Sequence, residues 1–147
     1  MRQTVEQEML KKMRDGLKKY GHIMQVHNIL YPGVWDTNYC SKGVEVWIEG
    51  KYLPSYPKRE STVIKIEHYT PQQRAWGMKR TYSGGKCFML FRIAENYYLF
   101  DALTAIKKVG KTLTKEGFFN HCIGYWNKTI NYSELQEILM AHNEKTN

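Results

Sequence analysis

Long apolar runs are missing from this sequence: no stretch approaches the roughly 18 residues that a membrane-spanning helix needs, so no membrane partner is expected. The N-terminal segment carries Glu6 and Glu8 where a secretory signal would need an uncharged apolar core, which predicts a cytoplasmic protein. Cysteine is scarce, and Cys40, Cys87 and Cys122 form no CxxC pair. This scarcity argues against a zinc site or a disulfide framework and predicts buried free thiols.

The composition is that of a folded chain. Of the 147 residues, 42% are hydrophobic and 14% aromatic, which is enough apolar surface for a core and excludes a disordered or low-complexity protein. A chain of this length ordinarily forms one domain, so we expect a single domain over residues 1–147.

Positive charge is concentrated in one segment. The formal net charge is +8, and residues 51–92 carry nine Lys and Arg residues against two acids. Such a field attracts polyanions, which makes nucleic acid the expected partner, with a solvated basic face as the alternative. The candidate phosphate-contacting residues in this segment are Lys58, Arg59, Lys65, Arg74, Lys79 and Arg80.

Apolar periodicity and turn residues predict the order of elements. Helical segments are expected at residues 4–20, 71–83, 102–108, 112–116 and 133–142, and strands at 22–30, 36–41, 44–51, 86–93 and 96–101. Thr70 with Gln73, and Ser133 with Gln136, have the spacing of capping boxes. We therefore expect an α/β domain, a small mixed sheet flanked by helices, with a core at about 4–101 and a mostly helical C-terminal extension.

A predicted hairpin brings two acids together. Its two-residue connection at 42–43 fixes a register in which Asp36 faces Glu49. Along the second strand Val44, Val46, Ile48 and Gly50 form a core face, and Glu45, Trp47, Glu49 and Lys51 share the other face. Opposed carboxylates about 4.5–5.5 Å apart repel unless a cation lies between them or one is protonated.

This arrangement predicts a magnesium site, since carboxylate oxygens are hard ligands for a hard cation. A metal there would polarise a phosphodiester, and Lys51 would orient the attacking water or stabilise developing negative charge. A surface charge ladder without a metal is the alternative interpretation. Glu6 lies on the inward face of the first predicted helix, where a carboxylate needs a positive partner, whereas Glu8 lies outside that face.

With these residues in place, the sequence resembles the PD-(D/E)xK nuclease superfamily. The segments PGVWD (32–36), VWIEGK (46–51), YTPQQRAW (69–76) and GG (84–85) are similar to its VRR-type branch and small phage relatives, over residues 4–101. The resemblance implies a restriction-endonuclease-like core. It also implies that Asp36 and Glu49 bind the metal with the carbonyl of Gly50, and that Lys51 is the catalytic lysine.

Two further positions and two departures belong to the resemblance. It implies that Glu6 is the helix glutamate that approaches the metal through water, and that Gln73 matches the glutamine of the helix after the lysine strand. The capping box explains Gln73 equally well. Trp35 replaces a proline, and Gly50 replaces a bulky apolar residue, which we expect to weaken the packing behind the site.

The function expected from residues and resemblance together is a metal-dependent DNA endonuclease that uses Mg²⁺, with Mn²⁺ as a possible substitute. It would be structure-selective, like a Holliday junction resolvase, and act in phage-type replication, recombination or repair. We expect it in the cytoplasm of a bacterium or of the bacterial host of a phage. Symmetric cutting of two strands needs two active sites, so a homodimer is expected. The alternatives are a nicking or exonucleolytic repair nuclease and a non-catalytic basic nucleic-acid-binding module.

Overall fold

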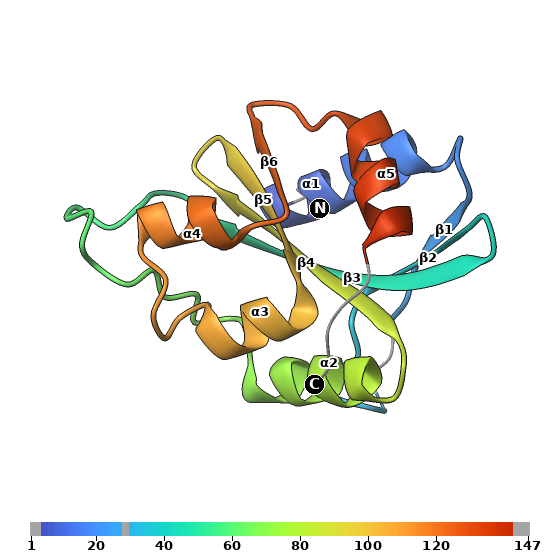
Figure 1. The fold of residues 1–147 in the computed structure, drawn as a ribbon, viewed down its shortest axis with the longest axis horizontal. Coiled ribbons are helices and arrows are strands. Elements are labelled where there is room, and N and C mark those ends of the chain that lie inside the picture. The colour runs from blue at the N-terminus through green and yellow to red at the C-terminus, as the bar shows by residue number, and fades with distance from the viewer. Residues whose placement is uncertain (1–3, 28–29, 143–147) are drawn as a thin grey trace.

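The computed structural model describes residues 4–27 and 30–142 and shows a six-stranded sheet with strand order β1-β2-β3-β4-β5-β6 (Figure 1). Among the described strands, only β3 and β4 are parallel neighbours. The predicted mixed sheet flanked by helices is confirmed. The strands are β1 (His22–Gln25), β2 (Thr37–Ser41), β3 (Val44–Leu53), β4 (Lys86–Ile93), β5 (Asn96–Asp101) and β6 (Gly124–Asn127). The helices are α1 (Val5–Leu17), α2 (Pro71–Tyr82), α3 (Ala102–Lys108), α4 (Lys115–His121) and α5 (Tyr132–Ala141).

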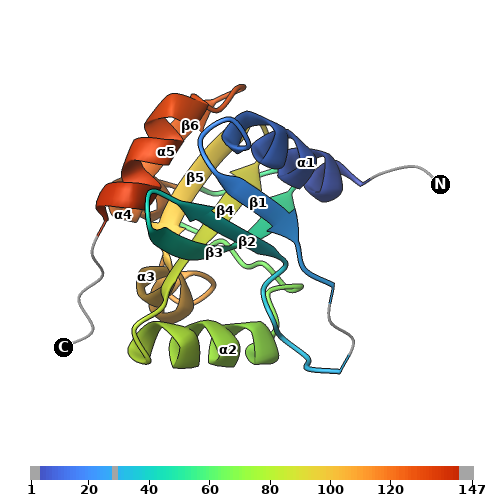
Figure 2. The same cartoon turned by 90° about the vertical axis from the view of Figure 1, so that its right-hand side faces the viewer.

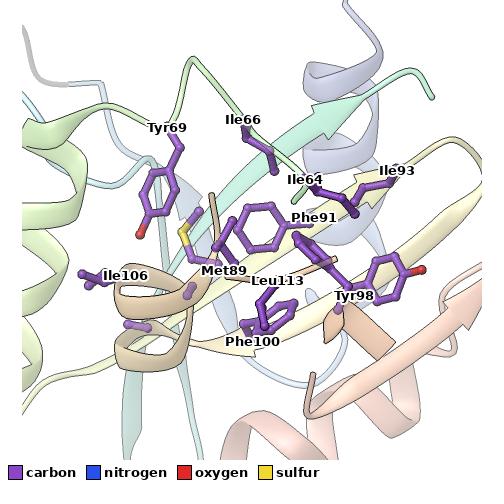
Figure 3. Close-up of a cluster of buried hydrophobic side chains, with 14 of the residues drawn as sticks. Ile64, Ile66, Tyr69, Met89, Phe91, Ile93, Tyr98, Phe100, Ile106 and Leu113 are labelled. Atoms are coloured by element: carbon purple, nitrogen blue, oxygen red, sulfur yellow. The ribbon is translucent and has the colours of Figure 1, made fainter. Parts of the chain in front are cut away.

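Helices cover both faces of the sheet, with α1 and α5 on one face and α2 and α3 on the other (Figure 2). The α1/α5 face buries Met9, Met13 and Leu17 against the sheet. The α2/α3 face holds an aromatic-rich cluster in which Phe91 and Phe100 take part (Figure 3). The sheet is therefore the middle of three layers. No helix within the described ranges is long and apolar enough to cross a membrane.

The β2–β3 hairpin has the predicted register. Thr37 pairs with Ile48, so the next positions outward are Asp36 and Glu49. The connecting residues Lys42 and Gly43 have φ values of 51° and 77°. Two successive positive φ angles are characteristic of a turn that matches the right-handed twist of its strands.

Both faces of β3 are covered. Val46 and Ile48 pack under α1 and α5, as expected for the core face. The opposite face, which gathers the ionisable groups, is also enclosed: Trp47 packs against the α2/α3 cluster, and Glu49 and Lys51 are buried. Glu49 therefore lies inside the protein, whereas Asp36 is half-buried and Glu45, nearer the turn, is exposed.

Some boundaries differ from the sequence predictions. β1 ends at Gln25, short of the predicted 22–30, and residues 28–29 lie outside the described part of the chain. The helix predicted at 112–116 begins after Thr114 as α4, and β6 was not predicted from the sequence.

The N-cap of α5 is Asn131 and not the predicted Ser133. The side-chain oxygen of Asn131 accepts the Glu134 N–H at 3.1 Å. Asn is among the strongest N-cap residues and lies two positions earlier.

The cysteine prediction is confirmed in part. All three cysteines are free thiols, which agrees with the absence of a disulfide framework. Cys87 is buried in the α2/α3 cluster, but Cys40 is exposed and Cys122 is half-buried, so the expectation that all three are buried is wrong. Cys40 lies on β2, the second strand from the edge of the sheet, and its side chain alternates with the buried residues Tyr39 and Ser41.

Gly50 does not weaken the packing behind the site, which corrects the sequence-based expectation. A Cβ atom at this position would lie 2.6 Å from Leu10 Cδ2 and 3.0 Å from Met9 Cε. Side chains of α1 thus fill the space that a bulky residue on β3 would otherwise occupy. The missing side chain allows a close approach of helix to strand, and this approach also brings the first turn of α1 to the edge of β3.

Candidate active site

Three predicted site residues come together at the open end of the β2–β3 hairpin. The peptide N–H of Asp36 donates to Glu49 Oε1 at 3.2 Å, and Lys51 Nζ lies 3.5 Å from Glu49 Oε2. Glu49 and Lys51 are only 3% and 4% exposed, while Asp36 is half-buried. Asp36 Oδ1 accepts a hydrogen bond from Thr37 Oγ1 at 3.2 Å. One lysine therefore faces two carboxylates in a largely enclosed space.

The electrostatics of this cluster are unbalanced. Burial, assisted by the neighbouring Asp36 carboxylate, raises the pKa of Glu49 to about 8, although Lys51 acts in the opposite direction. Burial also raises the pKa of Asp36, and the Thr37 hydrogen bond and the Lys51 charge oppose this rise. Two carboxylates that resist joint ionisation are a favourable place for an added cation.

The donor set fits a hard divalent cation. Asp36 and Glu49 offer carboxylate oxygens, and the Gly50 carbonyl, which the family resemblance implies as a further ligand, belongs to the residue between Glu49 and Lys51. Within the described ranges, no group of three or more His, Cys, Asp or Glu side chains is placed to hold a metal. A cation at this pair would therefore depend on two carboxylates, backbone oxygen and water, which is how Mg²⁺ is commonly bound.

Glu6 reaches the same region from α1. Its Oε2 atom accepts the Tyr52 N–H at 3.2 Å, on a part of β3 beyond the last β2 pair, Thr37 with Ile48. The same oxygen lies 3.0 Å from Nε2 of His68. This side chain thus closes a free strand edge and joins α1 to the segment that precedes α2. The sequence analysis placed Glu6 on the inward face of the helix, but spacing alone gave no indication of its partner 62 residues away.

Gln73 and Trp35 are both built into the start of α2. Gln73 Oε1 accepts the Thr70 N–H at 3.1 Å, and the Gln73 N–H donates to Thr70 Oγ1 at 3.2 Å, which is the predicted capping box. Trp35 is fully buried, and its indole N–H donates to the Gln73 carbonyl at 2.9 Å. The tryptophan that replaces proline therefore anchors the segment before Asp36 to α2. A catalytic role for Gln73 stays a prediction.

The predicted phosphate-contacting residues differ in how they are held. Lys58, Arg59, Lys65 and Lys79 are exposed. Arg74 points inward: its guanidinium donates to the carbonyls of Ile106 at 2.9 Å and Val109 at 3.0 Å, where it caps the end of α3. Arg80 is exposed and stacks on two indole rings. Their contacts with nucleic acid stay predictions.

The sequence analysis missed a hollow of about 830 Å³ between α4 and the β5–β6 ribbon, lined in part by Phe119 and Lys115. Its polar side is a hydrogen-bonded set in which Tyr125 OH donates to Asn96 Oδ1 at 2.6 Å and Asn96 Nδ2 donates to Tyr56 OH at 2.6 Å. None of the predicted site residues lines this hollow. Phe119 and Tyr125 belong to its lining, but aromatic residues in a sequence do not by themselves indicate a cavity.

No protein-family model matches this sequence. No curated protein matches it significantly either. Among solved structures, the fold is similar to that of Hjc, a Holliday junction resolvase from the archaeal hyperthermophile Archaeoglobus fulgidus, with a TM-score of 0.46 and 13% sequence identity. The match covers 69% of this chain and 75% of the resolvase chain.

Proposed function

We propose that this protein is a metal-dependent nuclease that hydrolyses phosphodiester bonds in DNA. The observation that carries the proposal is the buried cluster on β3, in which a single lysine faces the carboxylates of Asp36 and Glu49. Enclosed carboxylates with too little positive charge around them are suited to hold a divalent cation. The motif spacing that resembles the PD-(D/E)xK nucleases supports the same chemistry.

Each residue of the cluster has a distinct role in this proposal. Asp36, Glu49 and the Gly50 carbonyl would hold Mg²⁺, for which Mn²⁺ is a possible substitute. A divalent cation supplies Lewis-acid polarisation of the phosphate ester and favours the ionisation of a water molecule. Lys51 places its ammonium group where negative charge develops on the phosphate, and its rotatable donors orient the attacking water. Glu6, at the rim, orients further water molecules.

The proposed substrate is branched DNA, and the proposed enzyme is a structure-selective homodimer of the resolvase type. The preference for branched DNA follows the resemblance of the sequence motifs, and the excess of basic residues in 51–92 supports a polyanionic substrate. A chain with one active site needs a second copy to cut two strands symmetrically. Nicking or exonucleolytic cleavage by the same chemistry is the alternative within this proposal.

The test is cleavage of matched labelled substrates: a four-way junction, a flap, a linear duplex and a single strand. Each is incubated with Mg²⁺, with Mn²⁺ and with EDTA, using the wild type, Lys51→Ala and the control Lys18→Ala, an exposed lysine at the C-cap of α1. The proposal expects metal-dependent cutting by the wild type and the control, with the junction preferred, and none by Lys51→Ala. Equal cutting by all three proteins, or cutting in EDTA, contradicts it.

A second candidate function, a non-catalytic nucleic-acid-binding module, is favoured by the burial of Glu49 and Lys51 at 3% and 4% exposure. In that case Glu49 and Lys51 form an internal ion pair with a structural role only. The module predicts tight, salt-sensitive DNA binding without cleavage in any metal, and it predicts that Asp36→Ala leaves binding intact or strengthens it. The nuclease predicts that Asp36→Ala binds DNA but has lost a cleavage activity that the wild type possesses.

A further inference from the structure

Arg80 is held on a series of tryptophans that runs from the core to the surface. Trp35 is fully buried, and its ring centroid lies 5.7 Å from that of Trp76, which in turn lies 5.1 Å from that of Trp47. The guanidinium carbon of Arg80 lies 5.0 Å from the Trp76 centroid and 5.6 Å from the Trp47 centroid. Two indole faces attract a guanidinium through the ring quadrupole, so the side chain is oriented although it is exposed.

The stem of Arg80 is fixed as well. A Cβ atom at Gly85 would lie 2.8 Å from Arg80 Cγ and 2.9 Å from Arg80 Cδ, so this conformation of the arginine depends on the glycine. Among the described residues, no carboxylate lies within 4.0 Å of the guanidinium. The charge is therefore positioned in advance, and no internal ion pair neutralises it.

This arginine borders a groove of about 440 Å³ between the β2–β3 turn and the connection from α2 to β4. Lys86 lines the same groove and adds a second cation. Glu45 is the acid in its lining, and its Oε1 accepts a hydrogen bond from Asn38 Nδ2 at 2.9 Å. The two cations outnumber this single carboxylate, so the groove favours an anion of modest size.

We propose that Arg80 and Lys86 form a subsite for a backbone phosphate of the nucleic-acid strand, a proposal that rests on the proposed function and defines where its substrate lies. The planar guanidinium fork matches two phosphate oxygens, whereas the indole faces are occupied by the arginine and are not free to stack on bases. Trp47 and Glu49 are two positions apart on β3 and share one face of the strand, with Cα atoms about 6.6 Å apart. The bound nucleic-acid strand would therefore run from this groove toward the carboxylates. The phosphate at Arg80 would lie a few nucleotides from the phosphate that is cleaved.

The experiment measures binding of a labelled duplex and a labelled four-way junction by fluorescence anisotropy, in EDTA and over a series of NaCl concentrations. Arg80→Gln is expected to weaken binding about 5-fold or more at low salt and to reduce the slope of log affinity against log salt concentration by about one unit. Arg80→Lys retains the slope but binds more weakly than the wild type. The control Lys18→Gln, at the C-cap of α1 on the opposite face of the sheet, is expected to change affinity less than about 2-fold.

Gly85→Ala separates position from charge. It leaves the net charge unchanged but crowds both the arginine stem and, at 2.9 Å, the Arg80 carbonyl. It is therefore expected to displace the guanidinium and weaken DNA binding, while far-UV circular dichroism and Tm show a folded protein. Unchanged affinity and salt slope in Arg80→Gln, or a wild type without salt-sensitive binding, overturns the subsite. If Arg80→Gln binds DNA more weakly and the wild type cuts no DNA in any metal, the subsite is supported and the nuclease proposal is overturned. The failure of one proposal is thus distinguishable from the failure of the other.

Discussion

The peptide N–H of Asp36 donates a hydrogen bond to the side-chain oxygen Oε1 of Glu49 at 3.2 Å, across a hairpin that separates the two residues by 13 positions. The other oxygen of Glu49 faces Lys51 Nζ at 3.5 Å. Both oxygens of one buried carboxylate are thus tied to the two residues with which it is proposed to act. The register of the β2–β3 hairpin therefore determines which residues pair in this part of the sheet, and it also determines which residues meet in the candidate site.

Removal of the lysine destabilises the protein in a pH-dependent manner. Lys51→Met retains the aliphatic volume but leaves Glu49 without a cation in a buried position, which costs about 3 kcal/mol when the acid is ionised. We expect a lower free energy of unfolding at pH 9 and a smaller effect at pH 5, where Glu49 carries a proton. Urea denaturation at the two pH values without metal measures this. Equal destabilisation at both values contradicts it.

Glu49 makes the metal-free protein less stable as pH rises. Its pKa is raised from 4.5 to about 8 in the folded state. The folded protein therefore retains a proton that the unfolded chain releases, so the stability from this group is fully present below pH 4.5 and is lost as pH rises toward 8. Glu49→Gln removes this dependence. The free energy of unfolding of both proteins is measured from pH 4 to pH 9. As pH rises over this range, the wild type should lose stability relative to Glu49→Gln.

Close packing of α1 on β3 makes Gly50 sensitive to enlargement. Gly50→Ala places a methyl group 2.6 Å from Leu10 Cδ2, so we expect a loss of about 1–3 kcal/mol in the free energy of unfolding. Leu10→Ala provides room for that methyl group, although it leaves a cavity by itself. In a double-mutant cycle the two substitutions together should cost less than the sum of their separate costs. Additive costs show that the two positions do not compete for space.

Glu6 and Glu8 provide a matched pair on one helix. Glu6 is half-buried at the strand edge, and Glu8 is exposed. Glu6→Gln retains an oxygen that accepts the Tyr52 N–H, so we expect stability within about 1 kcal/mol of the wild type but cleavage at least 10-fold slower, because the carboxylate charge near the metal is lost. Glu8→Gln should change neither quantity. Single-turnover cleavage and thermal unfolding of both variants provide the comparison, and equal cleavage by the two excludes a role for Glu6.

Sequence reasoning succeeded where local rules decide the structure. The turn at Lys42 and Gly43 has only two residues, so the position of Asp36 opposite Glu49 followed from counting. The start of α2 followed from Thr70 and Gln73, whose capping box is present. The inward orientation of Glu6 followed from helical periodicity.

Long-range packing decided what the sequence did not predict. The basic segment made Arg74 a candidate phosphate contact, which stays a prediction, but it gave no sign that the guanidinium donates to the carbonyls of Ile106 and Val109, more than 30 residues away. The space at Gly50 is filled from α1, a helix that is remote in sequence. The short strand β6 pairs with β5 and contains only four residues, too few for its alternation to be distinguished from that of a loop.

The measurement that tests the central claim most directly follows binding and cleavage of one labelled four-way junction side by side, with Mg²⁺, for wild type, Asp36→Asn and Lys51→Ala. The account predicts that all three proteins bind the junction with similar affinity and that only the wild type cuts it, with EDTA abolishing the cut. Tight binding by the wild type without cleavage in Mg²⁺ or Mn²⁺, or cleavage that survives both substitutions, would contradict the assignment of Asp36, Glu49 and Lys51 as a nuclease centre.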